Sequence, residues 1–331
     1  MFSSKRICVT LVGFSLISGV WGCGNQVTEN LVTNPGIEDT LDGNGLPRDW
    51  SFSVISGKYN HEVAQKAQSG KQALVVGGSG GAAEVQTNLA PVPAGTVLEC
   101  EAWVQTELVQ DGQPFVYTKF TRDDKTERSG MIPFNPKPKE WQKLHFFSAA
   151  EHDSSTNLAI QLAGEGLVRI DDVSMRVAPQ LSPGGLISSS TLEQLDEKGE
   201  LKEWRHVFRA TNSTQKVYKE GEASIFHMEG RNGWSVLCTH RAITSKPATI
   251  IFQGAIRVKK GDANLKIDYI KQNNCFSSTV SPPGRSEWTF VTVESDPALV
   301  EQAEAIRIAL STASKGEFSA DYTSLDVFVQ Q

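Results

Sequence analysis

Two stretches of the sequence place an aromatic and a charged side chain in the same phase. Trp103 and Glu101 alternate with apolar residues, and Tyr117 and Lys119 do the same in a later stretch. Alternate side chains of a strand point to opposite faces, so these four are expected to point away from the core. Aromatic rings stack on the C–H faces of sugars, and charged groups beside them bind hydroxyls. The four side chains therefore predict a saccharide-binding surface, provided that the two strands line one concave sheet.

Other residues leave alternatives open. Trp103 could instead pack under a loop or against another part of the chain. Trp234 is a second ligand candidate, because it follows Arg231-Asn-Gly233, which has the composition of a loop. Glu99 and Glu101 lie two positions apart on one face, about 7 Å from each other in a strand. That spacing is compatible with the paired carboxylates of a glycosidase, but we interpret the pair as an acidic rim.

Strands must position these side chains, and the chain predicts strands almost throughout. Apolar and polar residues alternate at 98–104 and at 250–258, as in half-buried strands. One helix-like stretch, 297–305, opens with Asp296 as a candidate N-cap. The Gly/Ser run at 77–81 predicts a flexible loop. Many short strands separated by turn residues predict an all-β protein built of sandwiches or barrels.

The chain repeats one order of motifs in two halves. The matching pairs are Asp42…Trp50 with Asp196…Trp204, Glu140-Trp141 with Glu287-Trp288, Gln142-Leu144-Phe146 with Thr289-Val291-Val293, and Ile170-Asp-Asp-Val173 with Leu325-Asp-Val327. An uncharged stretch rich in Pro and Gly, 178–183, predicts a linker between the halves. The repeat indicates a tandem duplication, with β-sandwich domains at 23–177 and 184–331.

The N-terminus has the features of a targeting segment. Lys5 and Arg6 precede a short apolar stretch that ends at Val20-Trp-Gly-Cys23. This pattern predicts a signal peptide over residues 1–22. A small residue before Cys23 is similar to the bacterial lipoprotein box, which implies a lipid on Cys23, a place at the bacterial cell envelope and membrane contact through that anchor only. Trp21 departs from the box, and the alternative is ordinary cleavage near Gly22 with release of a soluble protein.

Charge and cysteine usage narrow the class of protein. Acidic residues outnumber basic ones, 38 to 32, for a net charge of −6, which argues against a nucleic-acid partner. Cys238 and Cys275 could pair or remain free thiols. The absence of any C-x-x-C spacing disfavours a zinc ribbon.

Four motifs in order resemble carbohydrate-binding modules of the galactose-binding-like jelly-roll type. They are Asn34-Pro-Gly-Ile-Glu38 with the later Trp50, Ser69-Gly-Lys-Gln-Ala-Leu74, Cys100-Glu-Ala-Trp-Val104 and Val168-Arg-Ile-Asp-Asp-Val173. The resemblance implies two tandem jelly-roll β-sandwiches, the second a diverged copy. It also implies a structural calcium ion held by Glu38, Asp172 and the carbonyl of Lys71, in keeping with the oxygen ligands that calcium prefers. The alternative is a solvated carboxylate without an ion.

These observations predict a non-catalytic protein that binds a polysaccharide or cell-surface glycan. The binding surface would lie on the concave face of the first domain, with Trp103, Tyr117, Glu101 and Lys119 as contacts. The alternatives are a structural or protein-interaction scaffold without a sugar ligand, and a polysaccharide-processing enzyme.

Overall fold

The computed structural model describes residues 29–39, 41–135, 139–184, 201–202, 204–220, 223–239 and 243–330. The expected signal peptide at 1–22 and the expected lipid attachment at Cys23 lie outside these residues. Within them, no helix combines the length and the apolar character needed to cross a membrane.

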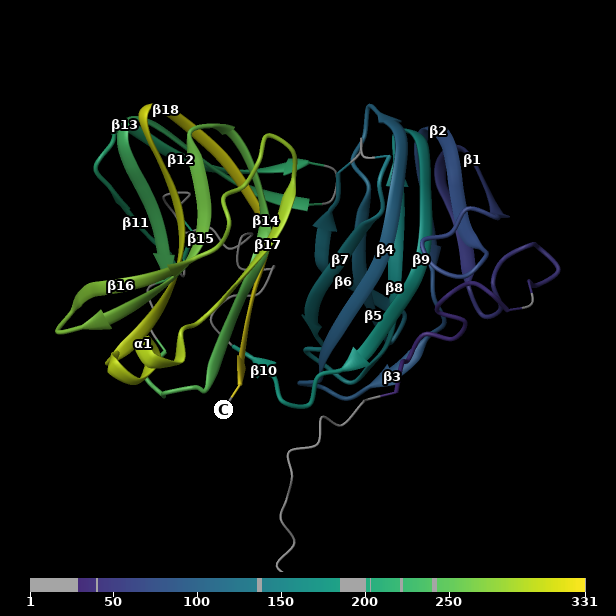
Figure 1. Ribbon diagram of the computed structural model, residues 1–331, viewed down its shortest axis with the longest axis horizontal. Helices are drawn as coiled ribbons and strands as arrows, with labels where there is room; N and C mark the ends of the chain where they lie inside the picture. The colour runs from purple at the N-terminus through teal and green to yellow at the C-terminus, as the bar shows by residue number, and fades with distance from the viewer. Residues whose placement is uncertain are drawn as a thin grey trace, which may run out of the picture.

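The first half is a β-sandwich made of β1 to β9 (Figure 1). Its strands are β1 (Ser51–Ala64), β2 (Ala73–Gln86), β3 (Ala90–Val92), β4 (Val97–Gln110), β5 (Phe115–Arg122), β6 (Lys125–Pro133), β7 (Gln142–Ala149), β8 (Ser154–Ala163) and β9 (Glu165–Val177). Hydrogen bonding joins them in the order β6-β5-β8-β2-β9-β4-β7, and β1 pairs with β2 and β3 with β8.

The second half contains the remaining strands and a short helix. These are β10 (Ser182–Pro183), β11 (Trp204–Phe208), β12 (Thr211–Glu220), β13 (Ala223–Thr239), β14 (Thr249–Lys260), β15 (Asp262–Lys271), β16 (Asn274–Val280), β17 (Thr289–Glu294), α1 (Pro297–Gln302) and β18 (Ala305–Gln330). The expected N-cap is confirmed, because the Asp296 carboxylate accepts a hydrogen bond from the Ala298 amide at 2.8 Å.

Both halves follow one pairing scheme. In the first, β2 pairs with β1, β8 and β9, while β4 joins β9 to β7 and β5 joins β8 to β6. In the second, β13 pairs with β12 and β18, while β14 joins β18 to β17 and β15 joins β18 to β16. The single long strand β18 therefore occupies the positions that β8 and β9 share in the first half. The shared scheme confirms that the chain is two tandem β-sandwiches.

Strand alternation places one apolar set inside each sandwich. In the first half, Ala102 and Val104 of β4 face Val116 of β5 within the core. In the second, Ile256 and Tyr322 do the same from β14 and β18. Burial of such side chains is the main stabilising contribution to a sandwich. Cys100 and Cys238 are buried, Cys275 is exposed, and all three are free thiols.

The Gly/Ser run of β2 is a strand, and the loop expected at 77–81 is wrong. Residues 74–78 pair with β9 and residues 82–86 with β8, so this run carries β2 from one neighbour to the other. A Cβ atom on Gly78 would lie 2.2 Å from the Lys58 carbonyl oxygen of β1. Glycine is required here because backbones approach closely, a use that resembles loop composition in the sequence.

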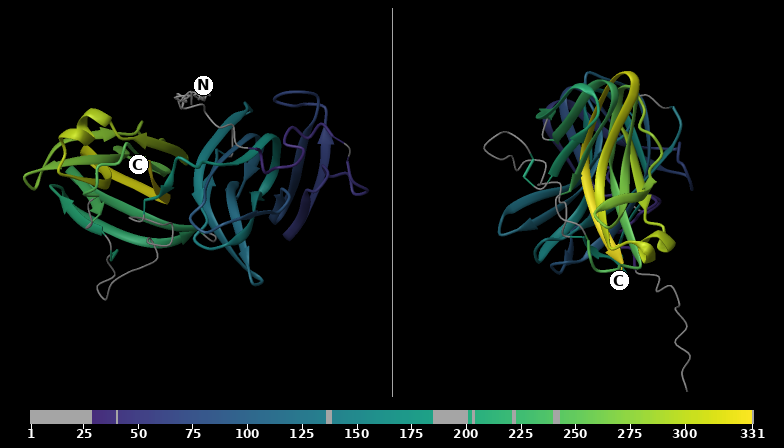
Figure 2. Two further views of the ribbon diagram at one scale, coloured as in Figure 1. Left: turned by 90° about the horizontal axis from the view of Figure 1, so that it is seen from below. Right: turned by 90° about the vertical axis from the view of Figure 1, so that its left-hand side faces the viewer.

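The two sandwiches lie side by side and share a buried junction (Figures 1 and 2). Its apolar members are Val97, Phe147, Ala178, Leu181, Ile251 and Phe328. The side chain of Gln253, fully buried, accepts a hydrogen bond from the Phe147 amide at 3.0 Å and donates one to the Phe147 carbonyl at 2.7 Å. The Ser324 hydroxyl donates to the carbonyl of Met131. Polar and apolar contacts thus hold the halves together.

Candidate functional site

An open groove of about 670 Å³ lies on the outer face of the first sandwich. Strands β1, β2, β8, β5 and β6 supply one side, and the loops before β1 and after β2 supply the other. Its lining residues are Thr33, Asp49, Ser51, Gln86, Thr87, Asn88, Leu89, Lys119, Thr121, Thr126 and Asn157. The lining is mostly amide and hydroxyl groups, with one cation and one carboxylate.

Glu84 organises the side chains beside this groove. It alternates with Ala83 and Val85, which are in the core, so its carboxylate points outward, although only 3% of the residue is exposed. Lys119 Nζ lies 2.9 Å from its Oε1, and Gln86 and the Tyr117 hydroxyl also donate to it. A buried carboxylate with such partners is fixed in place, and its partners are fixed with it.

Asn157 of β8 continues the same polar row. Its Nδ2 donates to Gln86 Oε1 at 3.0 Å and to the carbonyl of Thr87 at 3.4 Å. Its Oδ1 is buried and has no hydrogen-bond partner in the described part of the chain. A buried acceptor without a donor carries a desolvation cost.

The predicted aromatic surface does not form as expected. Three strands, β8, β2 and β9, separate Trp103 on β4 from Tyr117 on β5. Tyr117 is fully buried, its ring lies 5.2 Å from the Arg128 guanidinium, and its hydroxyl donates to Glu84. Burial, together with the Glu84 charge, raises the pKa of Tyr117 well above its usual value. Tyr117 therefore supports the groove from below and offers no exposed ring.

Trp103 and Glu101 lie on the outer face of the other layer. Trp103 is half-buried, opposite Lys143 of β7 and Asp171 of β9. The Glu101 carboxylate lies 2.7 Å from Lys143 Nζ. Of the four predicted contacts, only Lys119 lines the groove, and Tyr117 lies beneath it.

Trp234 lies inside β13, so the loop expected there is wrong. The strand continues through Asn232, whose positive φ of 52° accompanies a bulge between Arg231 and Gly233. Trp234 is half-buried and pairs in register with Ala313 of β18. The Asn-Gly pair here makes a bulge rather than a turn.

The residues expected to hold calcium come together at one end of the first sandwich. Glu38 Oε1 accepts hydrogen bonds from the amides of Lys71 and Gln72, which lower the pKa of Glu38. Gly36 adjoins both Glu38 and Asp172. Among the described residues, nothing donates a hydrogen bond to the Asp172 carboxylate. Oxygens of Glu38 and Asp172 with the Lys71 carbonyl fit the hard-oxygen set that calcium requires.

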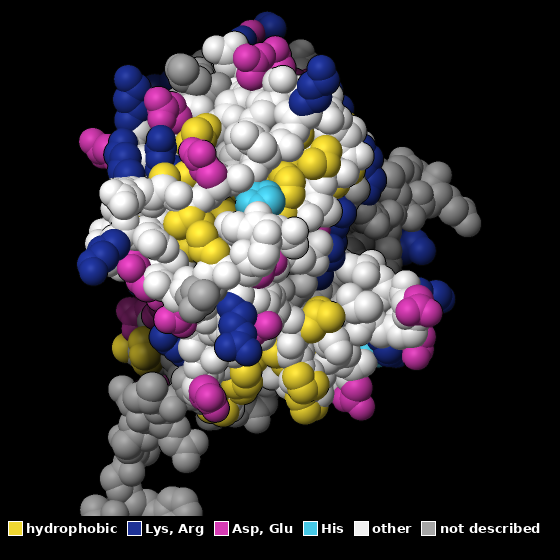
Figure 3. All heavy atoms as spheres, turned by 90° about the vertical axis from the view of Figure 1, so that its right-hand side faces the viewer, with side chains coloured by type: hydrophobic (Ala, Val, Ile, Leu, Met, Phe, Trp, Pro, Cys, Tyr) yellow, Lys and Arg dark blue, Asp and Glu magenta, His cyan; other side chains and the backbone are white. Residues whose placement is uncertain are grey.

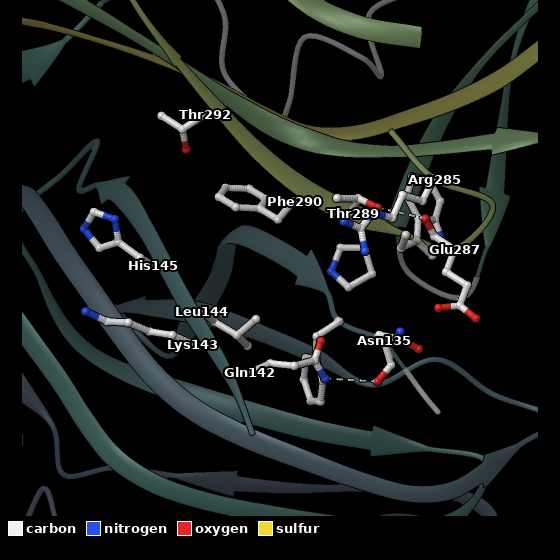
Figure 4. Close-up of a pocket in the computed structure, with 13 residues that line it drawn as sticks. Asn135, Gln142, Lys143, Leu144, His145, Arg285, Glu287, Thr289, Phe290 and Thr292 are labelled. Atoms are coloured by element: carbon white, nitrogen blue, oxygen red, sulfur yellow. Dashed lines mark hydrogen bonds between the residues drawn. The ribbon is translucent and has the colours of Figure 1, made fainter. Parts of the chain in front are cut away.

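A second cavity, of about 390 Å³, lies between the halves at β7 and β17. Figure 4 shows Lys143 and His145 of β7 on one side, and Phe290 with Arg285 on the other. The side chain of Gln142 donates to the Asn135 carbonyl at 3.4 Å along its wall. Neither half alone encloses this cavity.

The outer face of the second sandwich carries a dense ionic network. Asp321, fully buried, receives hydrogen bonds from His227 Nδ1 at 2.6 Å and Arg257 Nε at 2.9 Å, with Lys259 Nζ 3.0 Å away. Arg257 also lies over the Trp288 ring at 4.4 Å. Burial alone would raise the pKa of Asp321, but these donors hold it well below the usual range. The network occupies this face with contacts internal to the chain.

Sequence reasoning missed Glu84, Gln86 and Asn157. The signal was present for the first two, since Glu84 and Gln86 alternate with Ala83 and Val85 as clearly as Glu101 and Trp103 do with their neighbours. An aromatic residue is the usual signal of a sugar site, and β2 carries none at that point.

No protein-family model matches the chain, and no curated protein matches it. Among solved structures, it is similar to the N-terminal tandem of CBM22 domains of Xyn10C from Paenibacillus barcinonensis, at 14% identity over 91% of this chain and 97% of that chain, with a TM-score of 0.38. It is also similar to TmCBM61 in complex with β-1,4-galactotriose, at 16% identity over 45% of this chain and 99% of that one, with a TM-score of 0.33. A family 16 carbohydrate-binding module gives 12% identity, coverage of 44% and 99%, and a TM-score of 0.33.

Proposed function

We propose that the protein binds a glycan in the groove of the first sandwich and catalyses no reaction on it. The observation that carries the proposal is the open groove lined mainly by amide and hydroxyl side chains, beside which the buried Glu84 holds Gln86 and Lys119 in place. Sugar hydroxyls both donate and accept hydrogen bonds, and the Gln86 and Asn157 amides do the same. The exposed side chain of Leu89 supplies an apolar contact at the rim.

The chemistry of the groove favours a neutral polysaccharide over a charged one. Lys119 is the cation of the lining, and its charge is already balanced by Glu84 at 2.9 Å. Asp49 at the rim is exposed and disfavours an acidic chain. With hydrogen bonds as the main attraction, affinity for one site is weak, and many anchored copies acting together would strengthen it.

The test is a binding assay of the full chain against a panel of neutral and acidic polysaccharides, by affinity electrophoresis and calorimetry. Thr121→Val and Gln86→Leu are expected to weaken binding of the preferred polysaccharide at least tenfold. Gln302→Ala, on the exposed face of α1, is the control and should leave binding unchanged. Thermal unfolding of each variant separates loss of the ligand site from loss of the fold. Unchanged binding by both groove variants would contradict the proposal.

A scaffold without a sugar ligand is the second candidate, because Tyr117 is buried and no aromatic ring lines the groove. Figure 3 shows one end of the molecule, where hydrophobic side chains form small groups separated by polar and charged ones. That face does not offer the continuous apolar surface typical of a protein interface. Failure to bind any polysaccharide in the panel would favour the scaffold.

We further propose that the mature protein is attached to the bacterial cell envelope by a lipid on Cys23. The residues before Cys23 support this through their charge and apolar pattern. A Cys23→Ser variant expressed in a bacterium should move from the membrane fraction to the soluble fraction. A variant that stays with the membrane would contradict the anchor.

We also propose a structural calcium ion at Glu38, Asp172 and the Lys71 carbonyl. The ion would tie the loop before β1 to the last strand of the first sandwich. Calcium should raise the melting temperature of the full chain, and chelation should reverse the change. The increase should disappear in Glu38→Gln, while Glu62→Gln on β1 keeps it. A melting temperature indifferent to calcium would overturn the proposal.

A further inference from the structure

Three side chains of metal-ligating type, Glu99, Glu101 and His145, meet on β4 and β7, away from the groove and beside the cavity between the halves. Glu99 and Glu101 lie two positions apart on β4, and His145 lies directly opposite Glu101 on β7. One ligand atom from each, two carboxylate oxygens and a ring nitrogen, lie within 4.8 Å of one another. All three are held by paired strands, so the arrangement is rigid.

A metal ion could replace the partners that these side chains now have. His145 Nε2 lies 2.8 Å from Glu99 Oε1, and Lys143 Nζ lies 2.7 Å from Glu101 Oε1. The side chains of Glu99, Glu101 and His145 are 38%, 27% and 41% exposed, so an ion can reach them. Exposed ion pairs of this kind contribute little to stability, and breaking them costs little.

The second sandwich has none of these ligands at the matching positions. The pair Glu101 and His145 corresponds to Gln253 and Thr292, which are opposite each other on β14 and β17. Glu99 corresponds to Ile251, which is buried in the junction. At these positions, only the first sandwich carries the ligand set.

We propose that Glu99, Glu101 and His145 form a binding site for a zinc ion. Imidazole nitrogen with carboxylate oxygen suits zinc, whereas calcium and magnesium prefer oxygen alone. Zinc would bind His145 Nε2 and one oxygen of each glutamate, and water would complete the coordination.

A substitution at Lys143 tests whether these side chains form a metal site or only a cluster of solvated charges. Its ammonium group competes with the ion for Glu101, because both occupy the space beside Oε1. Replacing it by methionine removes the competing charge and keeps the length of the side chain. Lys143→Met should therefore tighten zinc binding several-fold, an effect that loss of a merely structural ion pair would not produce.

The experiment is calorimetric titration of the full, untagged chain with zinc sulfate, supported by thermal unfolding with and without zinc. We expect one saturable site, weakened at least tenfold in His145→Ala and in Glu99→Gln. His152→Ala, an exposed histidine in the turn after β7, and Cys275→Ser are controls that should leave affinity unchanged. Absence of saturable binding, or affinity unchanged in His145→Ala, would overturn the site, and so would loss in either control.

Discussion

The two halves place opposite charges at one position of the same framework. In the first, Arg169 of β9 lies opposite Gln105 of β4 and donates to Gln105 at 3.2 Å and to Glu107 at 3.0 Å. In the second, Asp321 of β18 lies opposite Arg257 of β14. There the central group is the acceptor, and its neighbours are the donors.

The difference lies in how completely each central charge is paired. The Arg169 side chain is 15% exposed, and its Nε has no hydrogen-bond partner among the described residues. Asp321 is fully buried and has His227, Arg257 and Lys259 around it. A long arginine reaches water with its tip, whereas a short buried aspartate cannot. Where the first half has an arginine that reaches water, the second half has a buried aspartate, and the aspartate is surrounded by more charged partners.

The largest effect is expected when the central acid of the second half is neutralised. Asp321→Asn removes the fully buried acid that His227, Arg257 and Lys259 share, and should lower the free energy of unfolding by about 3 to 5 kcal/mol. Urea unfolding at neutral pH measures this loss. A loss smaller than that caused by Arg169→Met would contradict the conclusion that the buried acid of the second half matters more to stability than the arginine of the first.

The same substitution should change the response to acid. Because the folded pKa of Asp321 is lowered, its contribution is complete above the pKa of an unfolded aspartate, about 3.9, and is lost as the pH falls below it. Stability measured from pH 6 downward should fall less steeply in Asp321→Asn than in the parent chain.

The second largest effect is expected at the junction. Gln253→Ala leaves the amide and carbonyl of Phe147 buried without partners, which should cost about 2 to 4 kcal/mol. Calorimetric unfolding should also separate into two transitions as the halves uncouple. Gln302→Ala is the control, and a single transition at the parent temperature would contradict the role of Gln253.

A smaller effect is expected at the central cation of the first half. Arg169→Met keeps the aliphatic stem and loses the bonds to Gln105 and Glu107, for about 1 to 2 kcal/mol. Urea unfolding of this variant beside Asp321→Asn gives the comparison directly. Equal losses would show that burial does not separate the two positions.

The smallest effect is expected at Glu101, the counterpart of Gln253. Its bond to Lys143 is partly exposed, so Glu101→Gln should change the free energy of unfolding by less than about 1 kcal/mol. A loss as large as that of Gln253→Ala would mean that the open face of the first half is as important to the fold as the junction.

The strands and the capped helix could be predicted because their signals are local. Alternation at 98–104 and the Asp296 cap need only neighbouring residues, and both are present as expected. The glycine run of β2 could not be assigned, because its close contact with Lys58 depends on pairing with another strand, β1, and not on the residues next to it in the sequence.

The candidate site was predicted only in part, for a physical reason. The phase of a strand shows which side chains leave the core, but not which layer the strand joins. Trp103 and Tyr117 both have the outward phase, and yet three strands lie between theirs. The burial of Tyr117 depends on Glu84 and Arg128, which belong to other strands.

The amide of Gln253 has a consequence for solubility. β7 ends the hydrogen-bonded order of its sheet, and an uncovered strand of this kind invites pairing with a second molecule. By bonding to both backbone groups of Phe147, the glutamine imitates a neighbouring strand at that point. The first sandwich expressed alone would lose the glutamine that covers β7, and the second would lose only the partner of Gln253. The first sandwich alone should therefore be the one that aggregates.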